Sequence, residues 1–364
     1  MQINIPRINN IQNSVMAKMY SKLFLITDNS NWSLSWDIKE LNSITDQLKI
    51  DTTVTKNFGF IKQSVFYASK YILMNPMYYL FFSSFQTRIG FSYFHGYPNS
   101  KDSTAITCYK NLKKYQRHIS RIQVSHSKMK HFVLDTKIDS KKVFLIPIGI
   151  NQNFFTKQTH ESKNFYRKRF GIPQQAVVIG SFHKDGVGMG KGIEPKLIKG
   201  PDILIKSLEI LKNKIPEIFV LLSGPARGYV KVGLEKLNIP YRHIILDHYP
   251  DINQLFQCID VYIIPSREEG GPKAILESMI SGVPLVTTRV GQAMDLVEHE
   301  KNGMMVSVED YEGLAFYTQK ILQDSDLTNR LIENGLLTAN SNTYSSQIPL
   351  WKSFFNGFVK MNID

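Results

Sequence analysis

The sequence predicts an α/β protein made of two domains, each with a doubly wound parallel sheet. Apolar segments of strand-like composition alternate with segments of helical periodicity through most of the chain, as in parallel sheets whose strands are connected by helices. The 364 residues are enough for two domains of ordinary size, and a hydrophobic content of 43% allows a substantial core in each.

A polar, basic segment near the middle of the chain marks the expected boundary between the domains. We expect an N-terminal domain over residues 1–155, a linker over 156–173 and a C-terminal domain over 174–340. In the first domain, we expect strands at 21–28, 49–56, 78–84, 88–94 and 141–151, with helices near 63–73, 105–119 and 128–134. Residues 29–37 are expected to lead into a further amphipathic helix through Leu41 and Ile44. In the second, we expect strands at 176–182, 219–224, 243–246, 260–264, 284–290 and 304–308, with helices between them.

The stretch 260–282 contains a strand, a tight turn and a helix. The strand DVYIIPS runs into Gly270 and Gly271, Pro272 stands at the expected first helical position, and Gly282 follows the expected helix end. The first backbone N–H groups of a helix have no partner within it and lie at the positive end of its dipole. An anion could therefore bind at Gly271, Pro272 and Lys273.

Two carboxylates flank this expected anion site. Glu269 stands in the turn and Glu277 stands in the helix. Carboxylates accept hydrogen bonds from hydroxyl groups. A diphosphate with a hydroxyl-bearing sugar on each side would satisfy all of these groups, so we expect a nucleotide sugar as the ligand.

The segment EGGPKAILESMISGVPLVTTRVGQ, with Glu269 and Glu277 in E-x7-E spacing, resembles the donor-binding core of glycosyltransferase family 4, a family of retaining enzymes in glycosyl transferases group 1. The resemblance implies the GT-B fold, in which two Rossmann-like domains face a central cleft. It also implies that Glu269 acts as a catalytic residue on the donor-sugar hydroxyls, that Glu277 binds the ribose, and that the anomeric configuration is retained. The family's last helix returns to the first domain, which implies the same for residues 341–364.

A second phosphate site is expected at the sequence KGPD. Lys199 and Gly200 precede a helix that begins at Pro201, which directs N–H groups and one ammonium at an anion. In the family, the lysine of this pair binds the donor diphosphate. The family's arginine after the first strand is replaced by Ser181, and Lys184 or Lys196 could take its place through the glycine-rich loop between them. The glycines of this loop fit neither a Walker A motif nor G-x-G-x-x-G.

His95 lies in the sequence FHGYP, at the carboxyl end of an expected strand, where ligands of open α/β sheets bind. A histidine there can serve a ligand or bond to the loop backbone, and the spacing leaves both open. In family 4 a histidine-glycine pair at this place faces the transferred sugar, so the resemblance implies a catalytic-site role for His95.

The expected helix at 105–119 and the residues directly after it are strongly basic. The whole chain has a formal net charge of +13. Such a surface is usually solvated, and contact with an anionic membrane through residues 105–121 is the alternative. The basic side chains are Lys110, Lys113, Lys114, Arg117, His118 and Arg121.

Several other classes are not expected. No group of residues has metal-ligand spacing, and Asp324, Ser325 and Asp326 are interpreted as a helix cap. We expect no cofactor, no nucleic-acid partner and a reducing compartment, because the sequence has two distant cysteines and no reading motif for RNA or DNA. The polar start and the short apolar runs favour a cytoplasmic protein, with the inner face of the membrane as a possible location.

The expected function is transfer of a sugar from a nucleotide sugar to a glycan or lipid-linked acceptor in cell-surface polysaccharide or lipopolysaccharide synthesis. Two alternatives remain open at this point. A sugar-nucleotide epimerase would convert the donor without an acceptor, and a non-catalytic polyanion-binding protein would use the positive charge.

Overall fold

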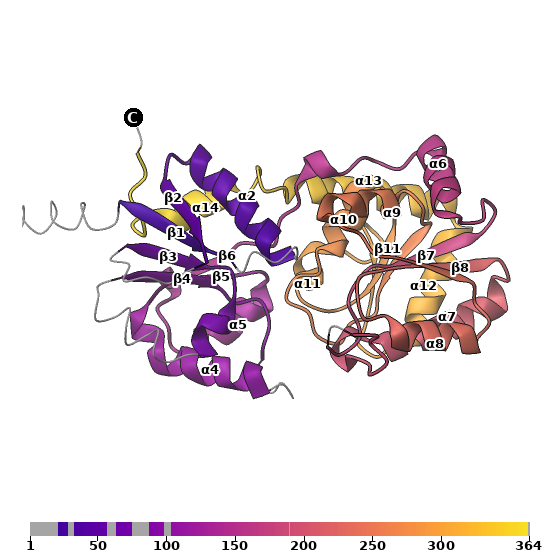
Figure 1. The fold of residues 1–364 in the computed structure, drawn as a ribbon, viewed down its shortest axis with the longest axis horizontal. Helices are drawn as coiled ribbons and strands as arrows, with labels where there is room; N and C mark the ends of the chain where they lie inside the picture. Colours follow the sequence, from indigo (N-terminus) through magenta and orange to yellow (C-terminus); the bar gives the residue numbers. More distant parts are fainter. Residues whose placement is uncertain are drawn as a thin grey trace, which may run out of the picture. The chain divides into compact units, whose positions relative to one another are not determined.

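The computed structural model describes residues 21–27, 33–56, 63–74, 87–97, 103–188 and 190–362. The chain folds into two compact units. The first unit contains residues 1–124, 128–146 and 347–364, and the second contains 125–127 and 147–346. Each unit has a six-stranded sheet with helices on both faces (Figure 1).

The first sheet has the strand order β2-β1-β3-β4-β5-β6, and all pairings are parallel. Its strands are β1 (Lys22–Ile26), β2 (Asp51–Thr55), β3 (Ser64–Tyr67), β4 (Arg88–Ser92), β5 (Ile119–Val124) and β6 (Val143–Leu145). The helices of this unit are α2 (Ser33–Gln47), α4 (Ser103–Tyr115), α5 (Ser127–Leu134) and α14 (Ile348–Phe355), with the short 3-10 helices η1 (Lys70–Met74), η2 (Gln116–His118) and η3 (Ser140–Lys142).

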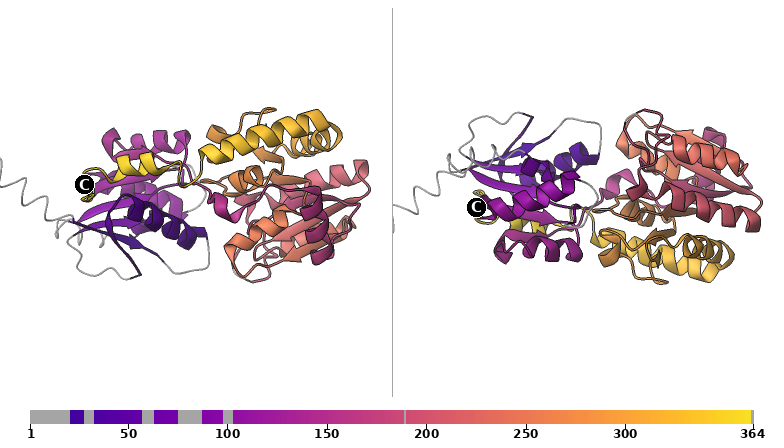
Figure 2. Two further views of the ribbon diagram at one scale, coloured as in Figure 1. Left: turned by 90° about the horizontal axis from the view of Figure 1, so that it is seen from above. Right: turned by 90° about the horizontal axis from the view of Figure 1, so that it is seen from below.

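The two faces of the first sheet are covered by segments that are far apart in the sequence. Ile89 and Phe91 of β4 pack in a core cluster with residues of α4 and α5. Gly90 faces the other way, because a Cβ there would lie 3.1 Å from Phe358. That face is covered by α14 (Figure 2), whose Trp351 contacts Phe66 of β3 at a ring-centroid distance of 5.8 Å. The aromatic residues of the C-terminal segment therefore pack on the first unit, as we expected.

The second sheet has the order β12-β11-β10-β7-β8-β9 and is also fully parallel. Its strands are β7 (Val177–Ser181), β8 (Ile218–Ser223), β9 (Tyr241–Ile244), β10 (Val261–Ile264), β11 (Leu285–Thr288) and β12 (Met304–Val306). The helices are α6 (His160–Phe170), α7 (Pro201–Lys214), α8 (Gly228–Lys236), α9 (Ile252–Phe256), α10 (Ala274–Ile280), α11 (Ala293–Leu296), α12 (Tyr311–Gln323) and α13 (Ser325–Ser341), with the 3-10 helices η4 (Gln152–Phe154), η5 (Leu197–Lys199) and η6 (Tyr249–Asp251).

Successive residues of the central strands of this unit enter two different core clusters. Tyr262 and Ile264 of β10 pack with residues of α9 and α10, whereas Val261 and Ile263 pack with residues of α7, α8 and α12. Side chains that alternate in this way fill both faces of the sheet, so the strand is buried on both sides. The fold class predicted from the sequence is confirmed.

Two of the elements expected in the first domain are not found as helix or strand in the described structure at the places predicted. The helix expected over 63–73 is wrong, because the chain there forms strand β3 followed by η1, and Ser64, Val65 and Phe66 are all buried. A strand that is covered on both faces has a continuous apolar sequence, which periodicity cannot separate from a helix. The strand expected at 78–84 lies outside the described residues.

The expected linker over 156–173 is largely occupied by helix α6. Thr159 and Ser162 form a capping box at its start, and Gly171 ends it with a φ of 65°. Its buried Arg167 lies 2.7 Å from Asp260 Oδ2, which ties the helix to the second unit. The sequence of α6 has few apolar residues and shows no apolar stripe, which is the pattern that predicts an amphipathic helix. For this reason the sequence indicates a linker where the structure has a helix.

Candidate functional site

The segment between β10 and α10 forms the turn that the sequence predicts, but its helix begins later than expected. Helix α10 starts at Ala274 instead of Pro272, and Lys273 is its N-cap residue. The helix ends at Ile280, and Gly282 follows with a φ of 68°, a left-handed conformation that suits glycine. Gly270, Gly271 and Pro272 therefore form an extended turn ahead of the helix.

Glu269 is held by two hydrogen bonds. Its Oε2 atom accepts from Lys199 Nζ at 2.6 Å, and its Oε1 atom accepts from Ser266 Oγ at 2.9 Å. The side chains of Glu269 and Lys199 are 12% and 23% exposed, so the pair is partly open to a ligand. The structure thus brings together Lys199 and Glu269, which come from the two different motifs found in the sequence.

Lys199 is positioned by the backbone of Gly200. Gly200 has a φ of 66°, and a Cβ there would lie only 2.0 Å from the carbonyl oxygen of Pro265 at the end of β10. Pro201 then begins α7, at the helix position that proline favours. This close approach places the end of η5, and with it Lys199, beside the turn that carries Glu269.

Arg267 fixes the same turn to the start of α7. Its guanidinium donates to both carboxylate oxygens of Asp202 at 2.7 Å each, and to Glu309 on the other side. The hydrogen bonds to Asp202 and Glu309 raise the pKa of Arg267 above its usual value. The hydrogen bond from Arg267 also lowers the pKa of Glu309.

Glu277 is buried in the helix and hydrogen-bonded to Tyr249, which no motif in the sequence indicates. Glu277 Oε1 accepts from the Tyr249 hydroxyl at 2.6 Å, and Lys273 Nζ lies 5.1 Å from the centre of the same ring. Burial raises the pKa of Tyr262, and the charges of Glu277 and Glu269 raise it further. The Tyr262 hydroxyl itself accepts from the Phe182 N–H at 3.0 Å.

Gly271 is required by the packing of its turn. A Cβ on Gly271 would lie 2.7 Å from Ile148 Cδ1 and 2.9 Å from Gln292 Oε1. Gln292 Oε1 in turn accepts from the Ile148 N–H at 2.9 Å. The turn and the loop after β11 thus fit closely together within the second unit.

In the glycine-rich loop after β7, close packing requires glycine at two positions. A Cβ on Gly186 or Gly192 would lie 2.3 Å or 2.1 Å from the carbonyl oxygen of Ala226. Gly188 and Gly190 have nothing within 4 Å of such an atom. The first two are explained by the close approach of two backbone segments and need no phosphate.

Arg227 reaches the place where the family's arginine is absent from the sequence. Its guanidinium donates to the Ser181 carbonyl at 2.6 Å and to Ser181 Oγ at 2.9 Å. Arg227 Nε also lies 3.0 Å from Asp185 Oδ1, at an ion-pair distance although the angles are not those of a hydrogen bond. Burial lowers the pKa of Arg227 and raises the pKa of Asp185. Because both side chains are fully buried, Arg227 supports this loop from inside.

His183 follows directly after β7 and Phe182. Its Nε2 atom is buried, and no hydrogen-bond partner for it is found among the described residues. Burial lowers the pKa of His183 well below its usual value, and the charges of Arg227 and Lys199 lower it further. Lys184, the residue that the sequence analysis considered as a phosphate ligand, is half-buried in the same loop.

His95 lies in the first unit, after β4, and is exposed. The buried Lys70 donates to its carbonyl at 2.8 Å and lies 3.1 Å from its Nδ1 atom. An ammonium can only donate, so Nδ1 accepts and the ring proton of the neutral histidine is on Nε2. The other predicted site residues belong to the second unit, and the role of His95 remains a prediction.

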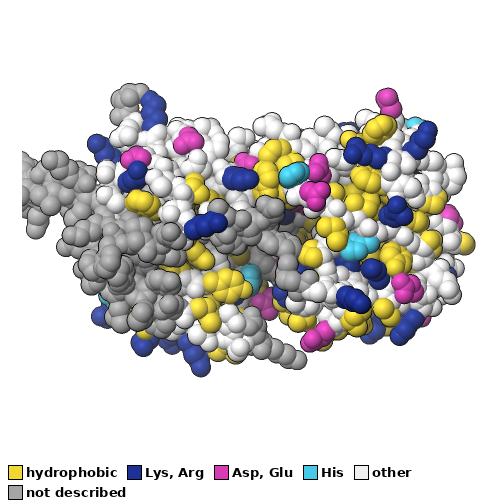
Figure 3. Space-filling view, viewed as in Figure 1, with side chains coloured by type: hydrophobic (Ala, Val, Ile, Leu, Met, Phe, Trp, Pro, Cys, Tyr) yellow, Lys and Arg dark blue, Asp and Glu magenta, His cyan; other side chains and the backbone are white. Residues whose placement is uncertain are grey.

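The basic residues at 105–121 are divided among three elements. Lys110, Lys113 and Lys114 lie exposed on α4, where Figure 3 shows a group of basic side chains. Arg117 is in η2, and Arg121 is in β5 and donates to the carbonyl groups of Phe354 and Asn356. The expected helix is therefore shorter than 105–119.

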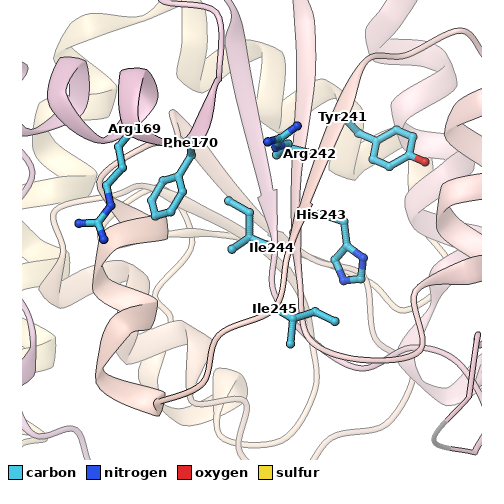
Figure 4. Close-up of a pocket in the computed structure, with 7 residues that line it drawn as sticks. All are labelled: Arg169, Phe170, Tyr241, Arg242, His243, Ile244 and Ile245. Carbon is cyan, nitrogen blue, oxygen red and sulfur yellow. The ribbon is translucent and has the colours of Figure 1, made fainter.

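Further observations concern sites elsewhere in the described part of the chain. It contains no group of residues that could hold a metal ion, and none of its helices has the length and apolar character needed to cross a bilayer. Asp324 accepts from the Leu327 N–H and caps α13, so this interpretation of the sequence is confirmed. A pocket of about 590 Å³ lies between the end of α6 and strand β9 (Figure 4), and its lining includes none of the predicted site residues.

The architecture is that of GT-B glycosyltransferases. The structure of Anabaena HepE in complex with UDP and glucose superposes with a TM-score of 0.72 and 17% identity, over 93% of this chain and 99% of that one.

Residues 193–337 match the model of the family described as glycosyl transferases group 1. An uncharacterized glycosyltransferase of Methanocaldococcus jannaschii is 26% identical over 239 residues, which are 65% of this chain and 58% of the relative. The capsular polysaccharide biosynthesis glycosyltransferase CapM of Staphylococcus aureus is 28% identical over 168 residues, 44% of each chain. The chain thus spans about half the length of the curated relatives it matches. These matches agree with the family to which the motifs point, and residues 193–337 are similar to the domain of glycosyl transferases group 1.

Proposed function

We propose that the protein is a retaining glycosyltransferase that moves a sugar from a nucleotide sugar to a glycan or lipid-linked acceptor. The contact between Lys199 and Glu269 is the observation that carries the proposal. In this pair, the Lys199 ammonium can bind a diphosphate and the Glu269 carboxylate can accept hydrogen bonds from sugar hydroxyls. Both side chains are partly exposed, so a nucleotide sugar could contact both of them.

The chemistry follows from the charges that develop during transfer. Departure of the nucleoside diphosphate leaves negative charge on its oxygens, and the sugar gains oxocarbenium character. Lys199 stabilises the leaving group, and Glu269 orients the hydroxyls of the transferred sugar. Ser266 and Arg267 hold Glu269 and its turn in place before the donor binds, which is electrostatic preorganisation.

The donor and the pathway are proposed from the relatives. HepE was crystallised with UDP and glucose, and CapM is named for capsular polysaccharide synthesis. A uridine diphosphate sugar and an acceptor in cell-surface glycan synthesis are therefore the first to test. An acceptor on a lipid carrier would bring the enzyme to the inner face of the membrane.

The variant Glu269→Gln tests the proposal. Glutamine keeps the shape of the side chain but cannot pair with Lys199 as an anion. We expect transfer from the donor to fall by about a hundredfold or more, with an unchanged far-ultraviolet circular dichroism spectrum. Transfer is measured by product formation with UDP-, GDP- and ADP-sugars and a lipid-linked acceptor.

The matched control is Glu298→Gln, which removes an exposed carboxylate paired with Lys301. It should leave transfer unchanged. Full activity of Glu269→Gln would contradict the assignment. Conversion of the donor in the absence of any acceptor would point to an epimerase instead.

A further inference from the structure

A basic pocket of about 260 Å³ lies in the first unit, beside the segment in which the expected basic helix at 105–119 is divided into α4, η2 and the start of β5. The residues that define this basic pocket are Arg88, Arg117, Arg121 and Lys142, together with Gly357 and Phe358 of the C-terminal segment. Among the described residues, those that line it include no acidic side chain.

The basic pocket is at the amino-terminal edge of the first sheet. Arg88 is the first residue of β4, Arg121 is near the start of β5, and Lys142 directly precedes β6. All three strands are parallel, so their carboxyl ends lie at the opposite edge. Ligands of open α/β sheets bind at that carboxyl edge, where His95 follows β4. The basic pocket is therefore separate from the site predicted around His95.

Part of the positive charge has a structural explanation. Arg121 donates to the carbonyl groups of Phe354 and Asn356, and Arg88 donates to those of Gly357 and Phe358. These carbonyl groups lie in the last turn of α14 or just after it, where a helix carries about half a negative charge. The pocket holds four cationic side chains, so most of its positive charge is left after this compensation.

Arg117 and Lys142 supply charge that the α14 contacts do not use. The Arg117 side chain is exposed, and Lys142 Nζ lies 3.5 Å from the Arg117 carbonyl, a long contact. Burial lowers the pKa of Arg121, and the neighbouring Arg88 lowers it further. Like charges brought together in this way repel each other, and an anion between them would relieve the repulsion.

We propose that the basic pocket binds a phosphate group, which Arg88, Arg117, Arg121 and Lys142 surround. Guanidinium groups match the oxygens of phosphate with paired hydrogen bonds. A volume of about 260 Å³ is just below the range of about 300–1,000 Å³ that is usual for larger ligands. The size suits the phosphate of a lipid headgroup or a free phosphate ion better than a whole nucleotide sugar.

The experiment measures phosphate binding without the donor site. In a Lys199→Ala background, the thermal unfolding midpoint is followed with increasing inorganic phosphate, and chloride keeps the ionic strength constant. The double variant Arg117→Gln/Lys142→Gln removes two charges of the pocket. Lys110→Gln/Lys113→Gln removes two charges from α4 and is the matched control. The assay uses no donor and no acceptor, so its result is independent of the transfer assay.

We expect phosphate to raise the unfolding midpoint of the background protein and of the control, and its affinity for the pocket variant to be weaker by about tenfold or more. Equal affinity in the pocket variant and the control would overturn the proposal. An absent phosphate effect in the background protein would overturn it as well.

A second measurement distinguishes the two sources of phosphate. Sedimentation with phosphatidylglycerol vesicles is compared for the same variants. A loss of vesicle binding confined to the pocket variant assigns the pocket to a lipid headgroup. Unchanged vesicle binding combined with weaker phosphate affinity assigns it to a free phosphate compound. An equal loss in both double variants means that total charge alone governs vesicle binding, and this contradicts a headgroup site.

Discussion

His183 is a half-buried histidine whose Nε2 atom is buried, and this environment lowers the pKa of its ring well below the usual value. Burial is the largest cause of its low pKa, followed by the charges of Arg227 and Lys199. In the unfolded chain the same ring takes up a proton near its usual value of 6.5. Unfolding at acidic pH therefore takes up a proton, and acid favours the unfolded state.

This difference predicts a dependence of stability on pH. The free energy of unfolding should fall as the pH drops below about 6.5, by up to about 1.4 kcal/mol per pH unit for one such group. In His183→Gln the free energy of unfolding should fall less steeply with decreasing pH, because one proton fewer is taken up on unfolding. Urea unfolding between pH 5 and 8 measures this slope. His160→Gln replaces an exposed histidine and is the control. A slope that is the same in both variants would exclude His183 as the source.

For single residues, the sequence indicated which side chains belong to the candidate site but not which residues they contact. Glu269, Glu277 and Lys199 stand in motifs with a definite spacing, and the structure brings Lys199 to Glu269. Arg227 lies far from Ser181 in the sequence, and nothing in its surrounding residues indicates that it reaches that side chain. Such a contact depends on the pairing of β7 with β8, which composition does not specify.

The elements around the candidate site depend on close backbone approaches, and Gly200 is the clearest case. Gly171 offers a matched comparison, because its φ of 65° is close to the 66° of Gly200 but a Cβ on Gly171 would have nothing within 4 Å. Alanine at Gly171 should cost only the strain of the left-handed backbone, about 1–2 kcal/mol. Alanine at Gly200 must also displace the Pro265 carbonyl.

We therefore expect Gly200→Ala to lower the free energy of unfolding by about 1–3 kcal/mol more than Gly171→Ala. Because the same approach positions Lys199, only Gly200→Ala should also weaken donor binding. Urea unfolding and calorimetric titration with a nucleotide sugar measure the two effects. Equal losses of stability in both variants would show that the backbone between η5 and α7 can move away from Pro265 with no loss of free energy.

The elements that the sequence predicted well are those with strong local signals. The six strands of the second unit fall within a few residues of their expected positions, because most of them are short apolar runs between polar turns. The errors arose where these signals were weak. Strand β3 is buried on both faces and has no alternation, and α6 is too polar to show a stripe, although Thr159 and Gly171 mark its two ends.

At the scale of the whole molecule, the alternation of strands and helices was sufficient to predict the fold class. The order of strands in each sheet was not predictable from that pattern, because it is set by which apolar faces meet after the chain has folded. The covering of the first sheet by α14 is such a long-range feature. The aromatic residues of α14 indicated that it packs on a core, and the family resemblance indicated which one.

Phe354 tests how much the first unit depends on this C-terminal helix. Its side chain is fully buried and contacts the rings of Phe66 on β3 and Phe144 on β6 at centroid distances of 5.6 and 5.1 Å. Truncation to alanine should cost about 3–5 kcal/mol. Leu350→Ala is the control in the same helix, because Leu350 is 42% exposed.

Hydrogen exchange measured by mass spectrometry locates the loss. In Phe354→Ala we expect faster exchange in β3, β4 and β5, whose sheet loses the cover on one face. Exchange in α7 and α12 should remain as in the unaltered protein, because their core cluster contains no residue of α14. Faster exchange in both sets would mean that the two units unfold as one cooperative body. In that case the C-terminal helix would stabilise the entire chain and not the first sheet alone.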